Sequence, residues 1–543
     1  MVKAKGKLKK NRANVQKSDN FWSNPYFLLF LIVFASFIVY SYSLKCDFVN
    51  WDDPAMVTDN TQVRSELSAK SLEDIFSVKG MSNEYQPLTT LTYHLIYNVF
   101  ELNPFYFHLF NIIFHLLNII LVFLFIKLLF NNINLALITA AFFAIHPLNV
   151  EVVAWISAAN YILFSFFSLL SLIFYIKYIK TNYKIIYIVY SFVFFALAIF
   201  SKSTALMLPL LFFVIDYFEK RSIKLGVFFE KAPFLILSLA SGLIALLLKE
   251  EVLSASTGII YTSFDRIFFV FYSVCLYLFK IIFPFNLKIV YAYPEKVNEV
   301  LPLELYILPL LITIGIILIF ILLKRERKLI VFSFFFFLIN IIMVIHIIPF
   351  YHIGIIAERY VYLASLGMFV MLAHFITKWR EEKTVYIKYV SSIIVVLYFA
   401  VLTINSSQRV RVWESDSTLF ADLIKKNPDE PVSYNNLGNK EDKAGNYEKA
   451  IGYYNQAISV NSNYAEAFYN RGLSYYNLNK YAEAHTDFNK AIQINPNFAK
   501  AFNNRGTAKY FLSDKKGACK DWEKALALGY SEAKGNLHDF CKD

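Results

Sequence analysis

Long apolar runs alternate with short charged breaks over residues 1–405. The first run, 25–44, is about as long as a helix that crosses a bilayer, for which roughly 20 apolar residues are needed. Further runs of this kind follow at 108–130, 134–150, 160–179, 184–201, 204–218, 232–249, 304–323, 329–349, 358–377 and 385–405. The pattern predicts an all-α, polytopic membrane helix bundle of about 11 spans over residues 25–405.

The charges in the breaks predict which way the bundle faces. The apolar run that starts at residue 25 is too long for a signal peptide, so we predict that it is retained as a helix. Residues 1–24 before it are basic, which predicts that they form a cytoplasmic N-terminus. Residues 45–107 then form a large extracytoplasmic loop. The basic cluster Lys324–Lys328 faces the cytoplasm only if the run at 267–286 does not span. We therefore expect 267–286 to be re-entrant or interfacial, and the chain to end outside.

The pattern changes at residue 406, where polar residues rich in Ala, Asn, Tyr and Lys begin. Gly438, Gly472 and Gly506 lie 34 residues apart, and several alanines repeat with the same spacing. A 34-residue period with small residues at helix contacts is typical of tetratricopeptide repeats. We expect a connecting helix within 406–430 and a solenoid of three repeats over 431–543, whose concave surface suits an extended polypeptide.

Composition narrows the class further. The chain has 57% hydrophobic and 18% aromatic residues, which excludes an ordinary soluble protein. Its net charge of +12 is spread over the breaks and the tail, a distribution that indicates topology and solvation rather than nucleic-acid binding. Cys519 and Cys541 could pair in an oxidising compartment, and two free thiols fit the sequence equally well. The abundance of Phe, Ile, Lys and Asn indicates an AT-rich genome and hence a bacterial inner membrane.

The candidate chemistry begins where the first apolar run ends. Asp52 and Asp53 stand side by side at this membrane edge, where carboxylates must be solvated, paired or used. An Asx turn before Pro54 is the structural alternative. Tyr85 and Gln86 close the same loop.

A polar stripe follows on the next apolar run. His108, Asn111, His115 and Asn118 are 3, 4 and 3 residues apart, which places them on one helix face. For the two deeper residues, hydrogen bonding between helices is the better interpretation. The stripe supplies no third ligand for a metal site, so the sequence is compatible with a divalent metal but does not require one.

Acidic and basic residues recur at other predicted outer helix ends. The predicted spans alternate between the two sides of the membrane, and this alternation places five further residues on the same face as the two aspartates, namely His146, Glu151, Lys202, Glu358 and Arg359. Such a mixture on an apolar bundle predicts a site for an anionic, lipid-linked substrate. Arg and Lys would hold a phosphate, and an aspartate would take a proton.

The ordered motifs resemble the transmembrane and tetratricopeptide-containing O-mannosyltransferases, of the GT-C class of glycosyltransferases. The resemblance runs through WDDP (51–54), YQPLTTLTY (85–93), HPLNVEVVAWIS (146–157) and ERYVYLASLG (358–367) and continues through 412–428 into the repeats. Two positions depart from the family pattern. Gln86 stands where that family usually has arginine, and Ser203 follows Lys202 where glutamate is common.

The resemblance implies a function. The donor would be a polyprenyl-phosphate monosaccharide, with mannose the leading candidate, and the acceptor a Ser or Thr hydroxyl of an exported protein held by the repeats. The transfer would be a direct inverting displacement with Asp53, favoured over Asp52, as general base. The donor phosphate would contact Arg359, Lys202 and His146, supported by Glu358, Glu151, Tyr85, Gln86 and His108. A glycolipid-modifying transferase and a membrane-anchored scaffold are the alternatives.

Overall fold

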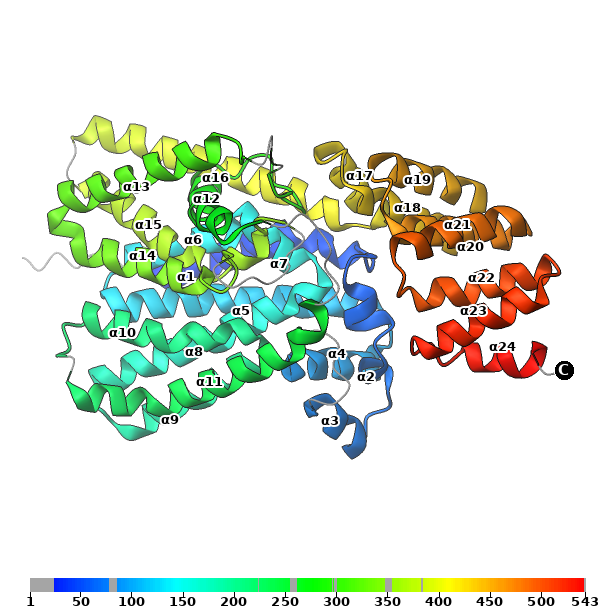
Figure 1. Cartoon of the computed structure of the whole chain (residues 1–543). Helices are drawn as coiled ribbons and strands as arrows, with labels where there is room; N and C mark the ends of the chain where they lie inside the picture. Colours follow the sequence, from blue (N-terminus) through cyan, green and yellow to red (C-terminus); the bar gives the residue numbers. More distant parts are fainter. Residues whose placement is uncertain are drawn as a thin grey trace, which may run out of the picture.

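The computed structural model describes residues 24–77, 85–222, 224–253, 261–294, 296, 300–346, 354–381 and 384–541. Residues 1–23 of the predicted cytoplasmic segment, and residues 78–84 within the predicted loop, lie outside these residues. Within them the regular elements are helices, arranged as a long bundle followed by a helical array (Figure 1). The predicted all-α architecture is confirmed.

Each predicted apolar run contains a helix. The bundle helices are α1 (Pro25–Tyr40), α5 (Pro104–Phe130), α6 (Ile133–Ile145), α8 (Ala159–Lys180), α9 (Ile185–Ser201), α10 (Leu208–Phe218), α11 (Leu225–Leu253), α13 (Glu304–Leu322), α14 (Arg327–Ile341), α15 (Ser365–Glu381) and α16 (Val385–Val410). Asparagine and proline set the starts of two of them. Asn24 and Asn103 accept a backbone N–H at the N-termini of α1 and α5, and each is followed by a helical proline.

Fewer of these helices are long and apolar enough to cross a membrane by themselves. Among the described residues five qualify, namely Pro25–Lys45, Pro104–Phe130, Ile156–Lys180, Leu225–Leu247 and Lys388–Trp413. A sixth is obtained if α6 and the helices after it, which bend by 54° at His146, count as one broken span. Ile185–Ser201, Ser203–Phe218 and Glu304–Leu318 are apolar but shorter. The chain is thus a multi-pass helical bundle, and the number 11 stays a prediction.

Helix α12 (Ser263–Ile282) covers most of the stretch expected to be re-entrant. It has Asp265 in its first turn and Lys280 in its last, and it is not among the candidate spans of the described chain. Figure 1 shows it nearly end-on, across the direction of its neighbours. This orientation is in keeping with a re-entrant or interfacial helix.

One buried segment joins the bundle to the loop. After α6 the chain forms a 3₁₀ turn (Pro147–Asn149), α7 (Val150–Ala154) and a second 3₁₀ turn (Ile156–Ala158) before α8 begins. Every residue from 146 to 160 is buried, and we call this segment the hub. The loop itself packs at the same end through α2 (Thr61–Arg64), α3 (Ala69–Phe76) and α4 (Pro87–Phe100).

The C-terminal array follows α17 (Asp416–Lys426). Its paired helices are α18 (Pro431–Lys443) with α19 (Tyr447–Val460), α20 (Ala465–Asn477) with α21 (Tyr481–Ile494), and α22 (Ala499–Phe511) with α23 (Lys515–Ala527); α24 (Ala533–Phe540) closes it. A Cβ added to Gly472 would lie 2.8 Å from the Phe488 ring, so glycine is required where the helices touch. Cys519 and Cys541, left open by the sequence, form a disulfide.

The array differs between its first repeat and the next two. Arg471 pairs with Asp487, and Arg505 pairs with Asp521 in the same geometry one repeat later. The first repeat has Leu437 at the corresponding arginine position, and this leucine joins the hydrophobic core shared with the bundle. The first repeat is therefore apolar where it meets the membrane part.

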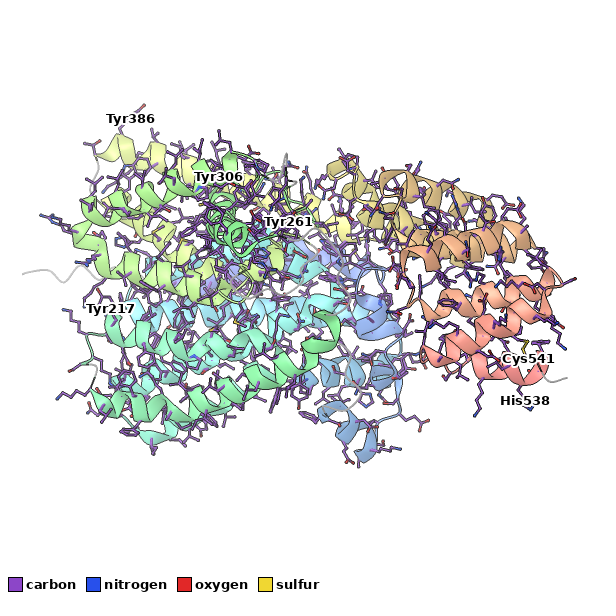
Figure 2. The ribbon with its side chains drawn as sticks, in the orientation of Figure 1. Tyr217, Tyr261, Tyr306, Tyr386, His538 and Cys541 are labelled. Atoms are coloured by element: carbon purple, nitrogen blue, oxygen red, sulfur yellow. A yellow bond between two sulfur atoms is a disulfide. The ribbon has the colours of Figure 1, made fainter. Side chains whose placement is uncertain are left out.

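The loop and the repeats lie at the same end of the bundle. Figure 1 shows the array and the loop helices α2 and α4 at the same end of the bundle. Figure 2 shows Tyr217 and Tyr386 at the opposite end from Cys541. The repeats and the aspartates therefore lie at one end of the bundle, and the compartment that this end faces is taken up below.

Candidate functional site

Asp53 anchors the loop onto the hub. Its Oδ2 accepts a hydrogen bond from the backbone N–H of Val49 (2.8 Å), and its Oδ1 accepts from the N–H of Ser157 (3.1 Å) and from the Ser157 hydroxyl. The side chain is 1% exposed. Burial raises the pKa of Asp53 from its ordinary value of 3.8 to about 7, although the hydrogen bonds from Ser157 and Val49 oppose this shift.

Asp52 lies beside Asp53 and is exposed. Its backbone carbonyl accepts from the N–H of Met56 (2.9 Å), which begins the turn Pro54–Thr58. The hydrogen bonds of the buried Asp53 thus hold the backbone from which the Asp52 carboxylate projects. The two adjacent carboxylates have different environments, one turned into the protein and one toward solvent.

Arg359 and Glu151 form the main ion pair of the site. The Nη1 of Arg359 lies 2.6 Å from Glu151 Oε1, and the backbone N–H of Arg359 donates to Oε2 at 2.9 Å. Glu151 belongs to α7 in the hub, and Arg359 to the 3₁₀ turn Glu358–Val361 that precedes α15. The guanidinium lies against the rings of Trp155 and Tyr360, 5.5 and 5.0 Å from their centroids. Carboxylate and rings together fix its position.

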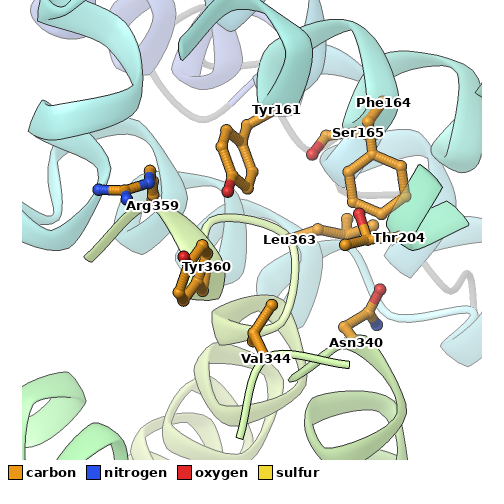
Figure 3. Close-up of a pocket in the computed structure, with 9 residues that line it drawn as sticks. All are labelled: Tyr161, Phe164, Ser165, Thr204, Asn340, Val344, Arg359, Tyr360 and Leu363. Atoms are coloured by element: carbon orange, nitrogen blue, oxygen red, sulfur yellow. The ribbon is translucent and has the colours of Figure 1, made fainter. Parts of the chain in front are cut away.

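Lys202 approaches the same place from α9. Its Nζ lies 4.2 Å from the centroid of the Tyr161 ring, and the residue is 5% exposed. Tyr161 and Arg359 both line a small cavity, which we call the Tyr161 cavity. Figure 3 shows Arg359 at one end of this cavity and Thr204 and Asn340 at the other. Two cationic side chains therefore flank one tyrosine beside an opening between α8, α14 and the start of α15.

A second cavity lies on another side of Arg359. It is small, and its lining includes Trp51, Ile289, Gly354 and Ala357 together with Arg359 and Tyr360. We call it the Trp51 cavity. Trp51 immediately precedes Asp52, so the loop that carries the two aspartates lines this cavity together with Arg359. Asp53, Glu151, Arg359 and Lys202 therefore have their contacts in or next to the hub, and Asp52 adjoins Asp53.

Three of the predicted residues have structural contacts instead. His146 uses both ring nitrogens, with Nε2 3.0 Å from the carbonyl oxygen of Ile281 and Nδ1 accepting from the N–H of Leu148. The hydroxyl of Tyr85 donates to the carbonyl of Phe76 (3.0 Å). Glu358 points away from its neighbour Arg359, accepting from the Tyr291 hydroxyl (3.1 Å) and pairing with Arg409 (3.4 Å).

The remaining two predicted residues are buried around the loop. Gln86 is 6% exposed, and its Oε1 accepts from the side-chain amide of Asn160 in the hub (2.8 Å). His108 is 1% exposed at the loop end of α5. Gln86 therefore joins α4 to the hub, and an arginine would bring an additional charge to this contact.

The polar stripe on α5 bonds helices to one another. Asn111 donates to the carbonyl of Trp155 (3.0 Å), and Asn118 to that of Ile162 (3.1 Å). The Nδ1 of His115 lies 2.7 Å from the Tyr362 hydroxyl. The expectation of interhelical hydrogen bonding for His115 and Asn118 agrees with these contacts. Among the described residues no group of three or more His, Cys, Asp or Glu is arranged to hold a metal ion.

Sequence reasoning missed the residues that position the predicted ones. Ser157, Trp155 and Tyr161 contact Asp53, Arg359 and Lys202 respectively. The first two lie inside the 146–157 motif, so the signal was present but their partners could not be read from it. Tyr161 follows shortly after and had no distinguishing pattern of its own.

The geometry defines a multi-pass membrane protein with a polar site under a loop and a tetratricopeptide array at the same end. Comparison with known families gives three matches. The family described as dolichyl-phosphate-mannose-protein mannosyltransferase matches residues 86–248, which include the hub and Lys202. Tetratricopeptide families match residues 443–479 and 465–498.

Curated relatives carry the likeness over most of the chain. Protein O-mannosyl-transferase TMTC3 of Homo sapiens is 27% identical over 499 residues, which are 84% of this chain and 53% of that protein. The TMTC3 protein of Mus musculus is 28% identical over 503 residues, with the same coverage. Protein O-mannosyl-transferase F38B6.6 of Caenorhabditis elegans is 24% identical over 81% of this chain and 63% of its own length. Over most of its length the chain is similar to protein O-mannosyl-transferases, in line with the resemblance of its motifs, and it spans about half the length of the TMTC3 proteins.

Among solved structures, the second tetratricopeptide domain of Spaghetti (RPAP3) bound to an HSP90 peptide is 36% identical. The match covers 18% of this chain and 92% of the solved domain, with a TM-score of 0.18. So low a score supports no argument about fold or ligand.

Proposed function

We propose that the protein is a membrane glycosyltransferase that moves one sugar, with mannose the leading candidate, from a polyprenyl-phosphate donor to Ser or Thr of exported proteins. The observation that carries the proposal is the meeting of three features at the hub. A loop with two adjacent aspartates, an arginine fixed by Glu151, and a lysine beside Tyr161 meet around the hub. The relatives' printed names support the same chemistry.

The cations suit a lipid-linked phosphate. Arg359 and Lys202 carry two positive charges, and Glu151 carries one negative charge, so the single negative charge of a phosphodiester that joins lipid and sugar would balance the set. The Tyr161 cavity lies among bundle helices, and its lining mixes apolar residues with Ser165, Thr204 and Asn340.

The aspartates divide the remaining work. The sequence favours Asp53 as the base, but its two carboxylate oxygens both accept hydrogen bonds from the protein, and the side chain is buried. Asp52 is exposed, and the hydrogen bonds of its neighbour Asp53 fix the backbone of this part of the loop. We therefore assign proton abstraction to Asp52 and positioning of the loop to Asp53.

The proposed reaction is a single displacement. The Asp52 carboxylate takes the proton of the acceptor hydroxyl, and the hydroxyl oxygen forms a bond to the anomeric carbon. The bond from that carbon to the phosphate oxygen breaks on the opposite face, which inverts the configuration. Arg359 and Lys202 stabilise the charge on the leaving lipid phosphate.

Charge and disulfide support an extracytoplasmic site. The end of the bundle opposite the loop carries Lys177 and Lys180 in the last turn of α8, and the turn from α13 to α14 carries the basic cluster at 324–328 (Figure 1). Basic residues of short loops remain in the cytoplasm. The Cys519–Cys541 disulfide in the array is typical of an oxidising compartment. The repeats would then hold acceptor polypeptides on the outer side.

A reconstituted transfer assay tests the proposal. The purified chain in nanodiscs is mixed with polyprenyl-phosphate mannose and Ser/Thr-rich peptides, and products are identified by mass spectrometry. Hexose on a Ser or Thr side chain, with an inverted linkage, is the expected result. Transfer only to a glycolipid would support the alternative enzyme, and donor binding without any transfer would support a scaffold.

A further inference from the structure

Helix α17 touches both sides of the Trp51 cavity. It leaves the bundle directly after α16 and packs against α18, the first helix of the array. Its first turn faces the aspartate loop, and its C-terminal end faces a strap formed by residues 287–291. Neither the predicted motifs nor the proposed reaction assigns a role to this helix.

Three contacts join α17 and the turn before it to the loop. The side chain of Asp416 accepts from the backbone N–H of Asn50 at 2.6 Å, two residues before Asp52. The carbonyl of Glu414 accepts from the N–H of Asp47 at 3.0 Å. The ring of Phe420 lies 6.2 Å from that of Trp51. The backbone leading to Asp52 is thus fixed by residues of the tail as well as by Asp53.

The other end of α17 holds the strap. Asn427 donates to the carbonyl of Val290 (2.6 Å) and accepts from Lys288 Nζ (2.8 Å), while Lys426 donates to the carbonyl of Leu287 (2.6 Å). The strap in turn is joined to the segment before Arg359. The N–H of Ile355 donates to the carbonyl of Tyr291 at 2.8 Å.

Asn427 differs from its equivalents in the repeats. Asn461 and Asn495 lie one and two periods later, and each accepts the backbone N–H two residues onward in a local turn. Asn427 instead uses both side-chain atoms on the strap. The first asparagine of the series has therefore changed from a turn former into a contact between the array and the membrane part.

We propose that Asp416 and Asn427 are positioning residues of the transferase site. Through them, α17 holds the repeat array in a fixed position relative to the aspartate loop and the strap, both of which line the Trp51 cavity. An acceptor segment held on the array would then enter at a fixed distance from Asp52. The proposal rests on the proposed function for its catalytic consequence, whereas the mechanical coupling follows from the contacts alone.

The test measures coupling and catalysis separately on the full chain. Hydrogen–deuterium exchange is followed in peptides covering 47–52 and 287–291, and transfer kinetics are measured with donor and acceptor varied in turn. Asp416→Ala should speed exchange at 47–52 by on the order of tenfold. It should lower kcat by about 10²-fold, as misplacement of a reacting group by about 1 Å does, with donor binding unchanged. Asn427→Ala should speed exchange at 287–291.

Matched variants separate positioning from general destabilisation. Asp416→Asn keeps an oxygen that can accept from Asn50 and should restore kcat. Lys425→Ala changes an exposed residue of α17, and Asn461→Ala removes only a local turn bond, so both should behave as wild type.

Exchange at 47–52 that is equal in Asp416→Ala and Lys425→Ala would overturn the coupling. Faster exchange with unchanged kcat would overturn the positioning role and leave a structural clip. Coupled exchange in a wild-type chain that transfers no sugar would refute the proposed function, and with it the catalytic consequence, while the mechanical coupling would stand.

Discussion

Replacing Asp53 with asparagine keeps the shape of a buried side chain and removes its charge. The aspartate accepts three hydrogen bonds, one from Val49 on Oδ2 and two from Ser157 on Oδ1. Asparagine offers only one acceptor oxygen, so its NH₂ group must face either the Val49 donor or the Ser157 donors. A buried donor without a partner costs about 1–3 kcal/mol, and this cost does not depend on pH.

The ionisation of Asp53 adds a pH-dependent part. Burial raises its pKa in the folded protein to about 7 from an ordinary value of 3.8. At a pH between these two pKa values, the folded chain keeps a proton that the unfolded chain releases. This proton binding stabilises the folded state fully below about pH 4, and the stabilisation is lost as the pH rises through 7. From pH 5 to pH 8 the wild-type protein should lose on the order of 3 kcal/mol that Asp53→Asn cannot lose.

The assay is thermal unfolding of both proteins in the same detergent at pH 5, 6, 7 and 8. The wild type should exceed Asp53→Asn by the largest margin at pH 5, and the margin should shrink toward pH 8. Asp59→Asn, an exposed position in the same loop, should follow the wild type throughout. A margin that is constant with pH would refute the reasoning, because Asp53 would then titrate as an exposed carboxylate does.

Three further predictions concern the donor, the array and the topology. Arg359→Ala should weaken donor binding and reduce transfer by on the order of 10²-fold, because the guanidinium would contact the phosphate before and during reaction; normal donor affinity in a binding assay would count against this. Gly472→Leu should make the array protease-sensitive because the Phe488 ring occupies the space, whereas Gly452→Leu, where a Cβ meets no atom within 4 Å, should not. A reporter active only outside the cytoplasm should be active when fused after Lys440, and a silent reporter would place the repeats inside.

Periodic features of the sequence predicted most of the fold. The apolar runs gave the helices, and the 34-residue period gave the repeats, because each pattern reports local packing that recurs along the chain. The number of spans is less accessible. Whether an apolar helix crosses the bilayer depends on its tilt and its neighbours as well as on its own residues, as the bend at His146 and the transverse α12 illustrate.

The site was predicted by residue type but not by partner. The sequence placed Asp52, Asp53, Glu151, Lys202 and Arg359 at one membrane face, and the structure brings them around the hub. Which carboxylate turns inward could not be predicted, because adjacent residues share every sequence feature. The choice depends on the Val49 donor in the loop itself and on the Ser157 donors in the hub, which is distant in sequence.

His146 and Glu358 show the same limit. Their positions at outer helix ends favoured contact with a substrate, yet tertiary partners direct them elsewhere. Ile281 and Leu148 engage the imidazole, and Tyr291 and Arg409 engage the carboxylate. Except for Leu148, these partners are distant in sequence, so spacing alone could not separate a substrate ligand from a structural contact. Neither residue has a role in the proposed reaction.

The central claim is that a loop aspartate removes the proton of an acceptor hydroxyl. The most direct measurement is sugar transfer by purified Asp52→Asn in nanodiscs, with donor binding measured on the same sample. We expect transfer to fall by about 10²–10⁴-fold while donor binding is kept, since a missing general base has this effect. Full transfer by Asp52→Asn, by Asp53→Asn and by the double variant would contradict the account and place the site elsewhere.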